Sequence, residues 1–177
     1  QLDHISIDTL VQGINRVEPS LIRVEADEVS YGLHVILRYE LEKLMIEGDL
    51  EVPDLEEVWN AKMEEYLGVV PSNASEGVLQ DIHWSHGSMG YFPTYLLGNL
   101  YAAQIFHQAN LAMPELEENI RSGKLIPLRE WLGREIHQRA KTVTAERLIE
   151  DITDEPLSSQ YFLDYLEHKF THLYGLS

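Results

Sequence analysis

The sequence predicts an all-α protein, and two observations lead to this fold class. Apolar residues recur every three or four positions in one segment after another, which is the period of an amphipathic helix. Prolines, glycines and short polar stretches separate these segments, as they do between consecutive helices. Signals for strands are few, and only the segment 77–84 could form a short extended piece. There is no internal repeat and no long linker, so residues 1–177 are expected to form a single helical segment.

The first half of the chain predicts two helices with recognisable ends. Ser6 is expected to cap a helix whose apolar residues fall on one face, and Pro19 breaks this pattern. A long helical pattern then runs from about Ile22 to Ile46. These boundaries place the residues just after Ile22 in the first turn of the long helix.

Further helices follow with equally clear punctuation. Asp54 is expected to cap the third helix, with Glu57 at capping-box spacing, and Gly68 to end it. The segment 94–113 is apolar nearly all round, which predicts a buried helix. Shorter helices are expected after Pro114, Pro127, Thr144 and Ser158, and in the last of them Phe162, Leu166 and Phe170 share a face.

Composition excludes several classes of function. Thirty acidic residues against 13 basic ones give a formal net charge of −17, which disfavours nucleic acid and anionic membranes as partners. The chain has no cysteine, so it holds no disulfide, no thiolate metal site and no cysteine nucleophile. No apolar run reaches the length of a membrane span, and we expect a cytoplasmic protein. The sequence begins without methionine and enters a helical pattern almost at once, which indicates a cut point.

The segment 81–95, DIHWSHGSMGYFPTY, is the most unusual part of the sequence. It is rich in aromatic residues and glycines and has neither helical nor strand periodicity, which is typical of a binding loop on a rigid frame. His83 and His86 are close enough to suggest a metal site, but no third ligand follows at a suitable spacing. Asp81 could instead orient an imidazole, and a polar loop histidine is the simpler alternative.

Tyrosines and glycines in this segment suggest peptide or carbonyl chemistry. The hydroxyls of Tyr91 and Tyr95 could donate hydrogen bonds to a developing oxyanion, although packing tyrosines with satisfied hydroxyls are common. Gly87 and Gly90 would allow the backbone to approach an extended ligand closely, and they fit an ordinary turn equally well.

Arg23 is a candidate anion-binding residue, because its guanidinium would lie at the positive end of the long predicted helix. An intrahelical pair with Asp27 is the structural alternative. His168 and His172 have the spacing of zinc-binding helices, but Lys169 stands where such helices carry the glutamate that acts as general base. We interpret this pair as part of a solvated face and predict no metal ligand in the chain.

Two stretches resemble motif regions of the Taq-type (thermostable) metallocarboxypeptidases. The first is IRVEADEVSY at 22–31, and the second is GVLQDIHWSHGSMGYFPTYLLGNLYAAQIF at 77–106. The second is long and idiosyncratic, and Val29 and Met89 are the apolar departures from the usual pattern. The resemblance extends over most of the chain. It implies the helical fold of the neurolysin and angiotensin-converting-enzyme group, with a substrate channel between two halves.

The resemblance also implies what this chain lacks. The family binds its metal through a His-Glu-x-x-His helix and a further glutamate, and this sequence contains no His-Glu-x-x-His. The chain therefore resembles the C-terminal part of the enzyme, inactive alone, with the metal-binding part as its partner. The full-length protein would be a cytoplasmic, often homodimeric enzyme that uses zinc or cobalt and removes C-terminal residues from peptides with broad specificity.

By motif position, the resemblance assigns roles to the candidate residues. Arg23 would bind the free C-terminal carboxylate of the peptide, and His83 would donate a hydrogen bond to the substrate backbone or oxyanion. Tyr91 or Tyr95 would stabilise the tetrahedral intermediate, and Gly87 and Gly90 would lie against the peptide. The alternative is a non-catalytic helical peptide-binding or scaffold domain derived from the same family.

Overall fold

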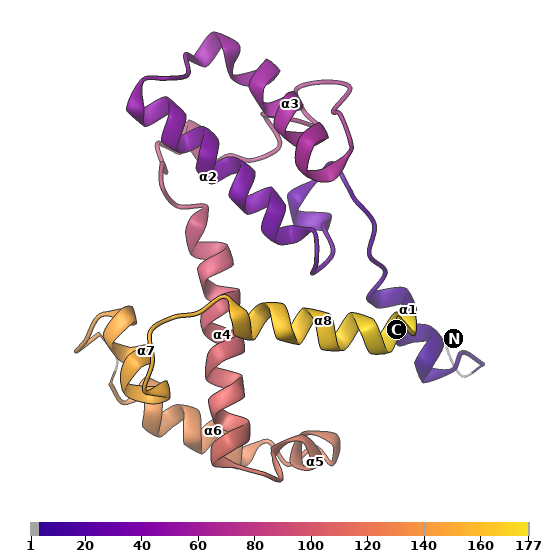
Figure 1. Ribbon diagram of the computed structural model, residues 1–177, viewed down its shortest axis with the longest axis vertical. Coiled ribbons are helices and arrows are strands. Elements are labelled where there is room, and N and C mark those ends of the chain that lie inside the picture. The colour runs from indigo at the N-terminus through magenta and orange to yellow at the C-terminus, as the bar shows by residue number, and fades with distance from the viewer. Residues whose placement is uncertain (1–3, 140, 177) are drawn as a thin grey trace. The chain divides into compact units, whose positions relative to one another are not determined.

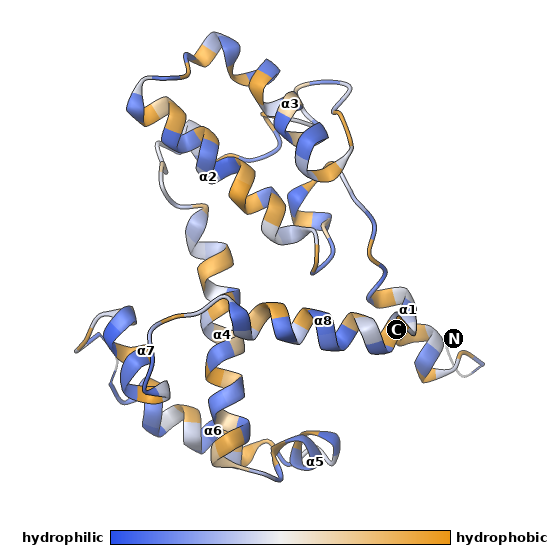
Figure 2. Cartoon of the chain, in the orientation of Figure 1, coloured by the Kyte–Doolittle hydropathy of each residue, from blue (hydrophilic) through white to orange (hydrophobic). Residues whose placement is uncertain are grey.

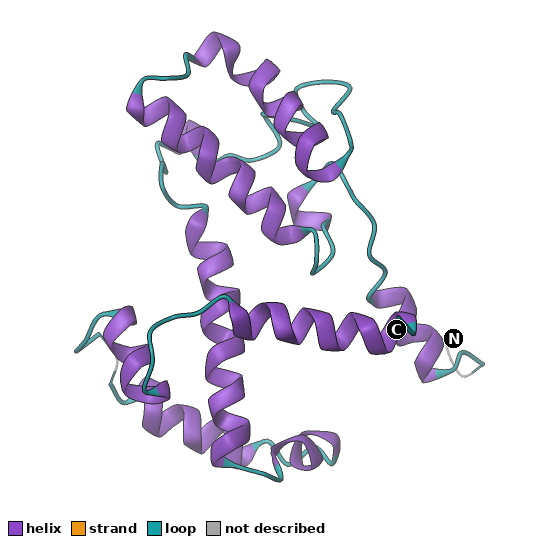
Figure 3. Cartoon of the chain, in the orientation of Figure 1, coloured by secondary structure: helices purple, strands orange, loops and turns teal. Residues whose placement is uncertain are grey.

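The computed structural model describes residues 4–139 and 141–176, and the fold is all-α, as predicted (Figures 1 and 3). The described residues contain no strand, and 77–84 forms turns rather than an extended piece. The α-helices are α1 Ile7–Ile14, α2 Tyr31–Glu47, α3 Leu55–Leu67, α4 Pro93–Ala112, α5 Leu116–Arg121, α6 Ile126–Leu132, α7 Ala145–Thr153 and α8 Gln160–Tyr174. Short 3-10 turns at Arg23–Glu25, Val52–Asp54 and Trp84–His86 and a π-helical turn at Gly133–His137 complete the described elements. Within this part of the chain, none of the helices could cross a membrane.

The chain divides into two compact units, and the boundary falls between Leu96 and Leu97, inside α4. The first unit has its core between α2 and α3, where Leu37, Leu41, Trp59 and Met63 are almost completely buried. These residues come from apolar positions at helical spacing on the two helices, so burial of their shared face holds the pair together.

The start of α2 differs from the sequence-based expectation. The helix begins at Tyr31, whereas Arg23 lies in a separate 3-10 turn. Asp27 explains the difference, because one of its carboxylate oxygens accepts hydrogen bonds from the backbone N–H groups of Val29 and Ser30. A side chain that bonds nearby backbone in this way competes with helix formation and fixes a turn. Arg23 is therefore neither in the first helical turn nor paired with Asp27.

Helix capping agrees with the sequence in two places and differs in a third. The side chains of Ser6 and Thr144 accept hydrogen bonds from the backbone N–H groups three residues on, as expected. Asp54 makes no capping hydrogen bond, so the predicted capping box is wrong. The reason is that Asp54 ends a 3-10 turn in α-helical conformation, not in the extended conformation of a capping residue. Gly68 ends α3 in the left-handed conformation.

The second unit contains the C-terminal end of α4 and the helices that follow it. Its core includes Ala109, Leu116, Trp131 and Ile152. Gln104 of α4 is buried, and its side-chain amide donates to Thr153 and to the carbonyl of Pro156. These bonds join α4 to the end of α7 and to the segment that follows it, because a buried amide must find partners.

Burial of α4 is less complete than its composition predicts. Among its residues only Gln104 and Ala109 are buried, while Leu97, Phe106 and Leu111 are exposed. Figure 2 shows the mixture of apolar and polar residues along this helix. The expectation of a buried helix is therefore wrong for this chain. In α8, Phe162 and Phe170 are buried, in agreement with the shared face expected for them.

Candidate functional site

The two motif-bearing segments lie against each other in the first unit. The backbone N–H of Arg23 donates to the side-chain oxygen of Gln80 at 2.9 Å. The amide nitrogen of Gln80 donates in turn to the carbonyl of Leu21 at 3.0 Å. One glutamine thus satisfies backbone groups on both sides of Ile22, which fixes the 3-10 turn beside the loop that follows α3.

Asp81 connects two arginines. Its carboxylate accepts from Nη2 of Arg23 at 2.6 Å and from Nε of Arg38 at 2.7 Å. Arg38 is completely buried, and Arg23 is nearly so. Burial raises the pKa of the Asp81 carboxyl, but hydrogen bonds and charge from the two arginines outweigh it and lower the pKa below its usual value. Asp81 is therefore ionised and holds both guanidinium groups.

Arg38 supports the site from within the core, and the sequence reasoning did not identify it. Its guanidinium also donates to Gln80 and to the carbonyl of His34, and it lies 4.6 Å from the ring centroid of Trp59. Burial lowers the pKa of Arg38 to about 10, with Asp81 opposing the effect, so it stays charged near neutral pH. The available signal was a column of polar residues at i, i+4 and i+8, His34, Arg38 and Glu42, on one face of the predicted helix.

His34 is the second residue that the sequence reasoning missed. It is completely buried, and neither ring nitrogen has a hydrogen-bond partner among the described residues. Burial and then the positive charges of Arg38 and Arg23 lower its pKa to about 4. The imidazole is therefore neutral near pH 7 and adds no third positive charge to the arginine pair.

His83 is enclosed by aromatic rings. Its Nε2 lies 2.9 Å from the hydroxyl of Tyr95, and its ring stacks on Tyr91 with centroids 5.8 Å apart. Phe92, which is buried, packs at 4.4 Å between ring centroids. The other ring nitrogen, Nδ1, lies 3.9 Å from a carboxylate oxygen of Asp81. The structure thus brings together three of the predicted site residues, His83, Tyr91 and Tyr95.

The remaining aromatic contacts join this loop to the helices. Trp84 donates its indole N–H to Glu42 of α2 at 2.9 Å, and it packs edge-on against both Trp59 of α3 and Phe92. These contacts hold the loop on the α2–α3 pair, so the positions of the site residues depend on a packed core.

Gly87 and Gly90 adopt positive φ angles of 70° and 75°. This left-handed conformation alone favours glycine at both positions. Apart from the two neighbours in the chain, no atom of the described residues would lie within 4 Å of a β-carbon at either glycine, so the space beside them is open. His86, which lies next to Gly87 in the 3-10 turn, is exposed.

The charges of the site do not cancel among its closest members. Arg23 and Arg38 carry two positive charges, Asp81 carries one negative charge, and His34 is neutral. The guanidinium of Arg23 also donates from Nη1 to the hydroxyl of Tyr31 at 3.3 Å, and it lies 5.0 Å from the ring centroid of Tyr95. Within this ion-pair network, two guanidinium groups thus share one carboxylate.

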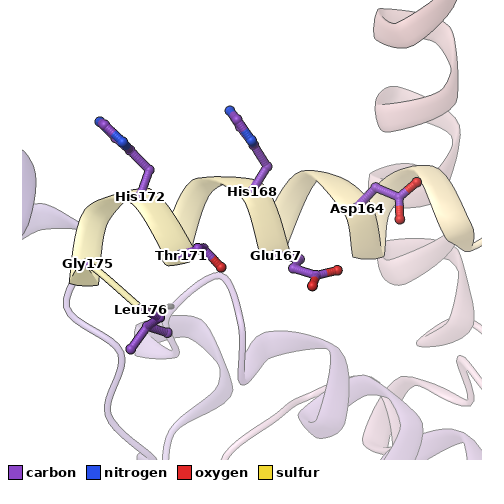
Figure 4. A pocket seen from close by; sticks show the side chains of 7 residues that line it. All are labelled: Asp164, Glu167, His168, Thr171, His172, Gly175 and Leu176. Atoms are coloured by element: carbon purple, nitrogen blue, oxygen red, sulfur yellow. The ribbon is translucent and has the colours of Figure 1, made fainter.

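The histidines of α8 lie outside this site. His168 and His172 are exposed, and Figure 4 shows both side chains projecting from the same side of the helix. They line a surface hollow together with Asp164, Glu167, Thr171, Gly175 and Leu176. Among the described residues, no group of three or more histidines, aspartates and glutamates could hold a metal ion. Residues 4–139 and 141–176 therefore offer no ligand set for a catalytic metal.

These features define a class of protein: an all-helical fold in which two loop segments and a helix bring two buried arginines together on one carboxylate, beside a cluster of aromatic residues. The match to known families agrees with it. Residues 1–170 match the model of the Carboxypeptidase Taq (M32) metallopeptidase family. The chain belongs to this family.

Curated relatives show how much of such a protein the chain represents. It is 43% identical over 176 residues to Carboxypeptidase 1 of Bacillus subtilis, covering 99% of this chain and 35% of that protein. It is 45% identical over 174 residues to Thermostable carboxypeptidase 1 of Thermus thermophilus, covering 98% of this chain and 34% of that protein. The chain thus spans about a third of the length of these relatives.

Solved structures agree with the fold. The M32 carboxypeptidase of Deinococcus radiodurans superposes with a TM-score of 0.96 at 37% identity, over 99% of this chain and 35% of that one. A carboxypeptidase structure from Pyrococcus furiosus gives 0.93, also at 37% identity, over 96% of this chain and 34% of that one. The helical fold of this part of the family is therefore shared, whereas the relation to the neurolysin group stays a prediction.

Proposed function

We propose that the chain is the substrate-binding, C-terminal part of a metal-dependent carboxypeptidase that releases C-terminal amino acids from peptides with broad specificity. The observation that carries the proposal is the pair of arginines, only partly neutralised by Asp81, beside the hydrogen-bonding side chains of the loop. A peptide with a free C-terminus offers the matching groups, because it ends in a carboxylate next to the bond that is cleaved.

Arg23 would bind the terminal carboxylate of the substrate. Its Nε and Nη2 donate to Asp81, and its Nη1 donates to Tyr31. A guanidinium has five N–H hydrogens, so one hydrogen on each terminal nitrogen is left for a further acceptor. A carboxylate that approaches end-on can accept both, which is the strong two-pronged geometry. An anchor at this point admits only chain ends and thus favours removal of single residues.

The His83–Tyr95 pair and Tyr91 would supply hydrogen bonds to the substrate. A phenol that is held in place before the reaction stabilises developing negative charge without reorganising. The packing around His83 provides such order, since rings of Tyr91, Phe92 and Tyr95 surround it. Gly87 and Gly90 would let a peptide backbone approach the loop, and the open space beside them supports this role.

The metal chemistry would come from the remainder of the full-length protein. We propose zinc or cobalt as the metal, the N-terminal metal-binding part as the partner of this chain, and a homodimer in the cytoplasm. Residues 4–139 and 141–176, which offer no set of metal ligands, would bind and orient the peptide.

The experiment that tests the proposal is an end-product assay on the full-length protein that contains this chain. Short peptides with a free C-terminus should release single C-terminal amino acids, and a metal chelator should stop the release. The same peptides with an amidated C-terminus serve as the control and should be poor substrates. Cleavage at internal bonds regardless of the terminal group would contradict the proposal.

A non-catalytic peptide-binding or scaffold domain is the second candidate. The feature that favours it is the lack of any suitable metal-ligand group among the described residues. The two candidates differ in the same assay, since a scaffold would bind peptides with free carboxylates and leave them intact over prolonged incubation with added zinc or cobalt.

A further inference from the structure

The surroundings of His83 determine which of its nitrogens carries the proton. Nε2 lies 2.9 Å from the hydroxyl of Tyr95, a group that can either donate or accept. Nδ1 is buried and has no hydrogen-bond partner among the described residues. The carboxylate oxygen of Asp81 lies 3.9 Å from Nδ1, beyond hydrogen-bond distance but within strong electrostatic range.

The two neutral tautomers of His83 differ in free energy because of the surroundings of Nδ1. If the proton is on Nε2, a buried lone pair on Nδ1 faces the negative charge of Asp81 without any donor, which is unfavourable. If the proton is on Nδ1, the polar N–H faces the carboxylate, and Nε2 accepts a hydrogen bond from Tyr95. The second arrangement satisfies Nε2 and turns the contact with Asp81 from repulsive to attractive.

We propose that Asp81 is a positioning residue that keeps the proton of neutral His83 on Nδ1, so that Tyr95 donates its hydroxyl hydrogen to Nε2. Asp81 is suited to this function because two arginines fix its carboxylate. The ring of His83 cannot easily turn away, since Phe92 packs against it and Tyr91 stacks on it. In this proposal Asp81 does more than stabilise the fold, because it also sets the direction of the hydrogen bond between Tyr95 and His83.

The relay separates the roles of the two tyrosines. The hydrogen of Tyr95 is committed to His83, so the oxygen of Tyr95 has lone pairs available to accept an N–H of a bound peptide. Tyr91 is 48% exposed, and no hydrogen bond of its hydroxyl to another described residue restricts it. Tyr91 is therefore the phenol that can donate to a substrate oxygen. This division of roles rests on the proposed function, whereas the proton positions do not.

Neutron diffraction from crystals of the full-length protein, exchanged into D₂O near pD 8, tests the proton positions directly. The expected result is deuterium on Nδ1 of His83 and on the Tyr95 oxygen, directed at Nε2. Deuterium on Nε2, or on both ring nitrogens, would overturn the proposal. In Asp81→Asn the preference for Nδ1 should be lost, whereas Arg38→Lys, which keeps the carboxylate, should retain it. Should Asp81→Asn fail to fold, the wild-type neutron map still decides.

Steady-state kinetics of the full-length protein test the consequence for the tyrosines. Tyr91→Phe should lower kcat by roughly 10- to 100-fold with little change in KM, as expected for a donor that acts in the transition state. Tyr95→Phe should raise KM in addition to lowering kcat, because an acceptor for the bound peptide is lost. An unchanged kcat in Tyr91→Phe would overturn the catalytic role of Tyr91 and this part of the proposed function. If deuterium is nevertheless found on Nδ1 of His83, the tautomer assignment would stand.

Discussion

At the scale of single residues, Asp81 determines the organisation of the site. Its carboxylate binds Arg23 and Arg38, and it lies next to Nδ1 of His83. Removing its charge would leave two buried guanidinium groups without their shared counter-ion. Uncompensated buried charges are among the costliest defects in a folded protein.

Asp81→Asn is therefore expected to lower the free energy of unfolding by about 3–5 kcal/mol. Glu117→Gln is a suitable control, because Glu117 pairs with Arg121 in an exposed ion pair and should change stability by less than about 0.5 kcal/mol. Urea unfolding of the full-length protein measures both. Equal small effects of the two substitutions would show that the buried network does not contribute to stability.

His34 predicts a pH dependence of stability. The unfolded state takes up a proton near pH 6.5, whereas burial and the charges of Arg38 and Arg23 keep His34 neutral in the folded state down to a pKa of about 4. Between these values the unfolded state binds more protons, so stability falls as pH falls, by roughly 3 kcal/mol in all.

In His34→Gln, the free energy of unfolding should depend less on pH, although its absolute value will also change. Denaturant unfolding at pH 7.5, 6.0 and 5.0 gives the slope for each protein, and the slope of the wild type should be clearly steeper. The lowered pKa of Asp81 adds its own loss of stability only at still lower pH, so this range isolates the histidine. Parallel slopes would mean that His34 is protonated in the folded state or has its ordinary pKa.

At the scale of the elements, the helix ends distinguish side chains that cap from those that only occupy a capping position. Thr144 accepts the backbone N–H of Arg147 and stands in extended conformation before α7. Asp54 precedes α3 in α-helical conformation and makes no such bond. The two residues look equally good in the sequence, so the backbone conformation decides between them.

Thr144→Ala should cost about 1 kcal/mol of stability, and Asp54→Ala only a few tenths. Thermal or urea unfolding of the two variants under the same conditions provides the comparison. The reverse order would contradict the capping geometry of the structure.

The sequence predicted the helices well and their local starts less well. Apolar periodicity identifies α2 and α3 because it reflects a buried face. It could not place the start of α2, since Asp27 takes up backbone N–H groups that a helix would otherwise use. The same turn changes Arg23 from a helical residue into a partner of Asp81, which lies 58 positions further on, and local spacing carries no information about such a contact.

At the scale of the whole chain, the family and the all-α class could be predicted, whereas burial and the full site could not. The resemblance placed Arg23, His83, Tyr91 and Tyr95 in one candidate site, and their loops do meet in the first unit. The exposure of apolar residues on α4 was not predictable, because burial depends on neighbouring surfaces rather than on composition. Arg38 and His34 were not identified because a polar residue on an amphipathic helix gives no sign of its partners.

The central claim is that Arg23 binds the terminal carboxylate of a peptide, and one measurement tests it most directly. In the full-length protein, kcat/KM is determined for a peptide with a free C-terminus and for its amidated form, before and after Arg23→Ala. The exposed Arg16→Ala variant serves as the control. Loss of an anchoring charge pair predicts a decrease of about 100-fold for the free peptide and little change for the amidated one. Equal losses on both peptides would contradict the claim and assign Arg23 a purely structural role beside Asp81.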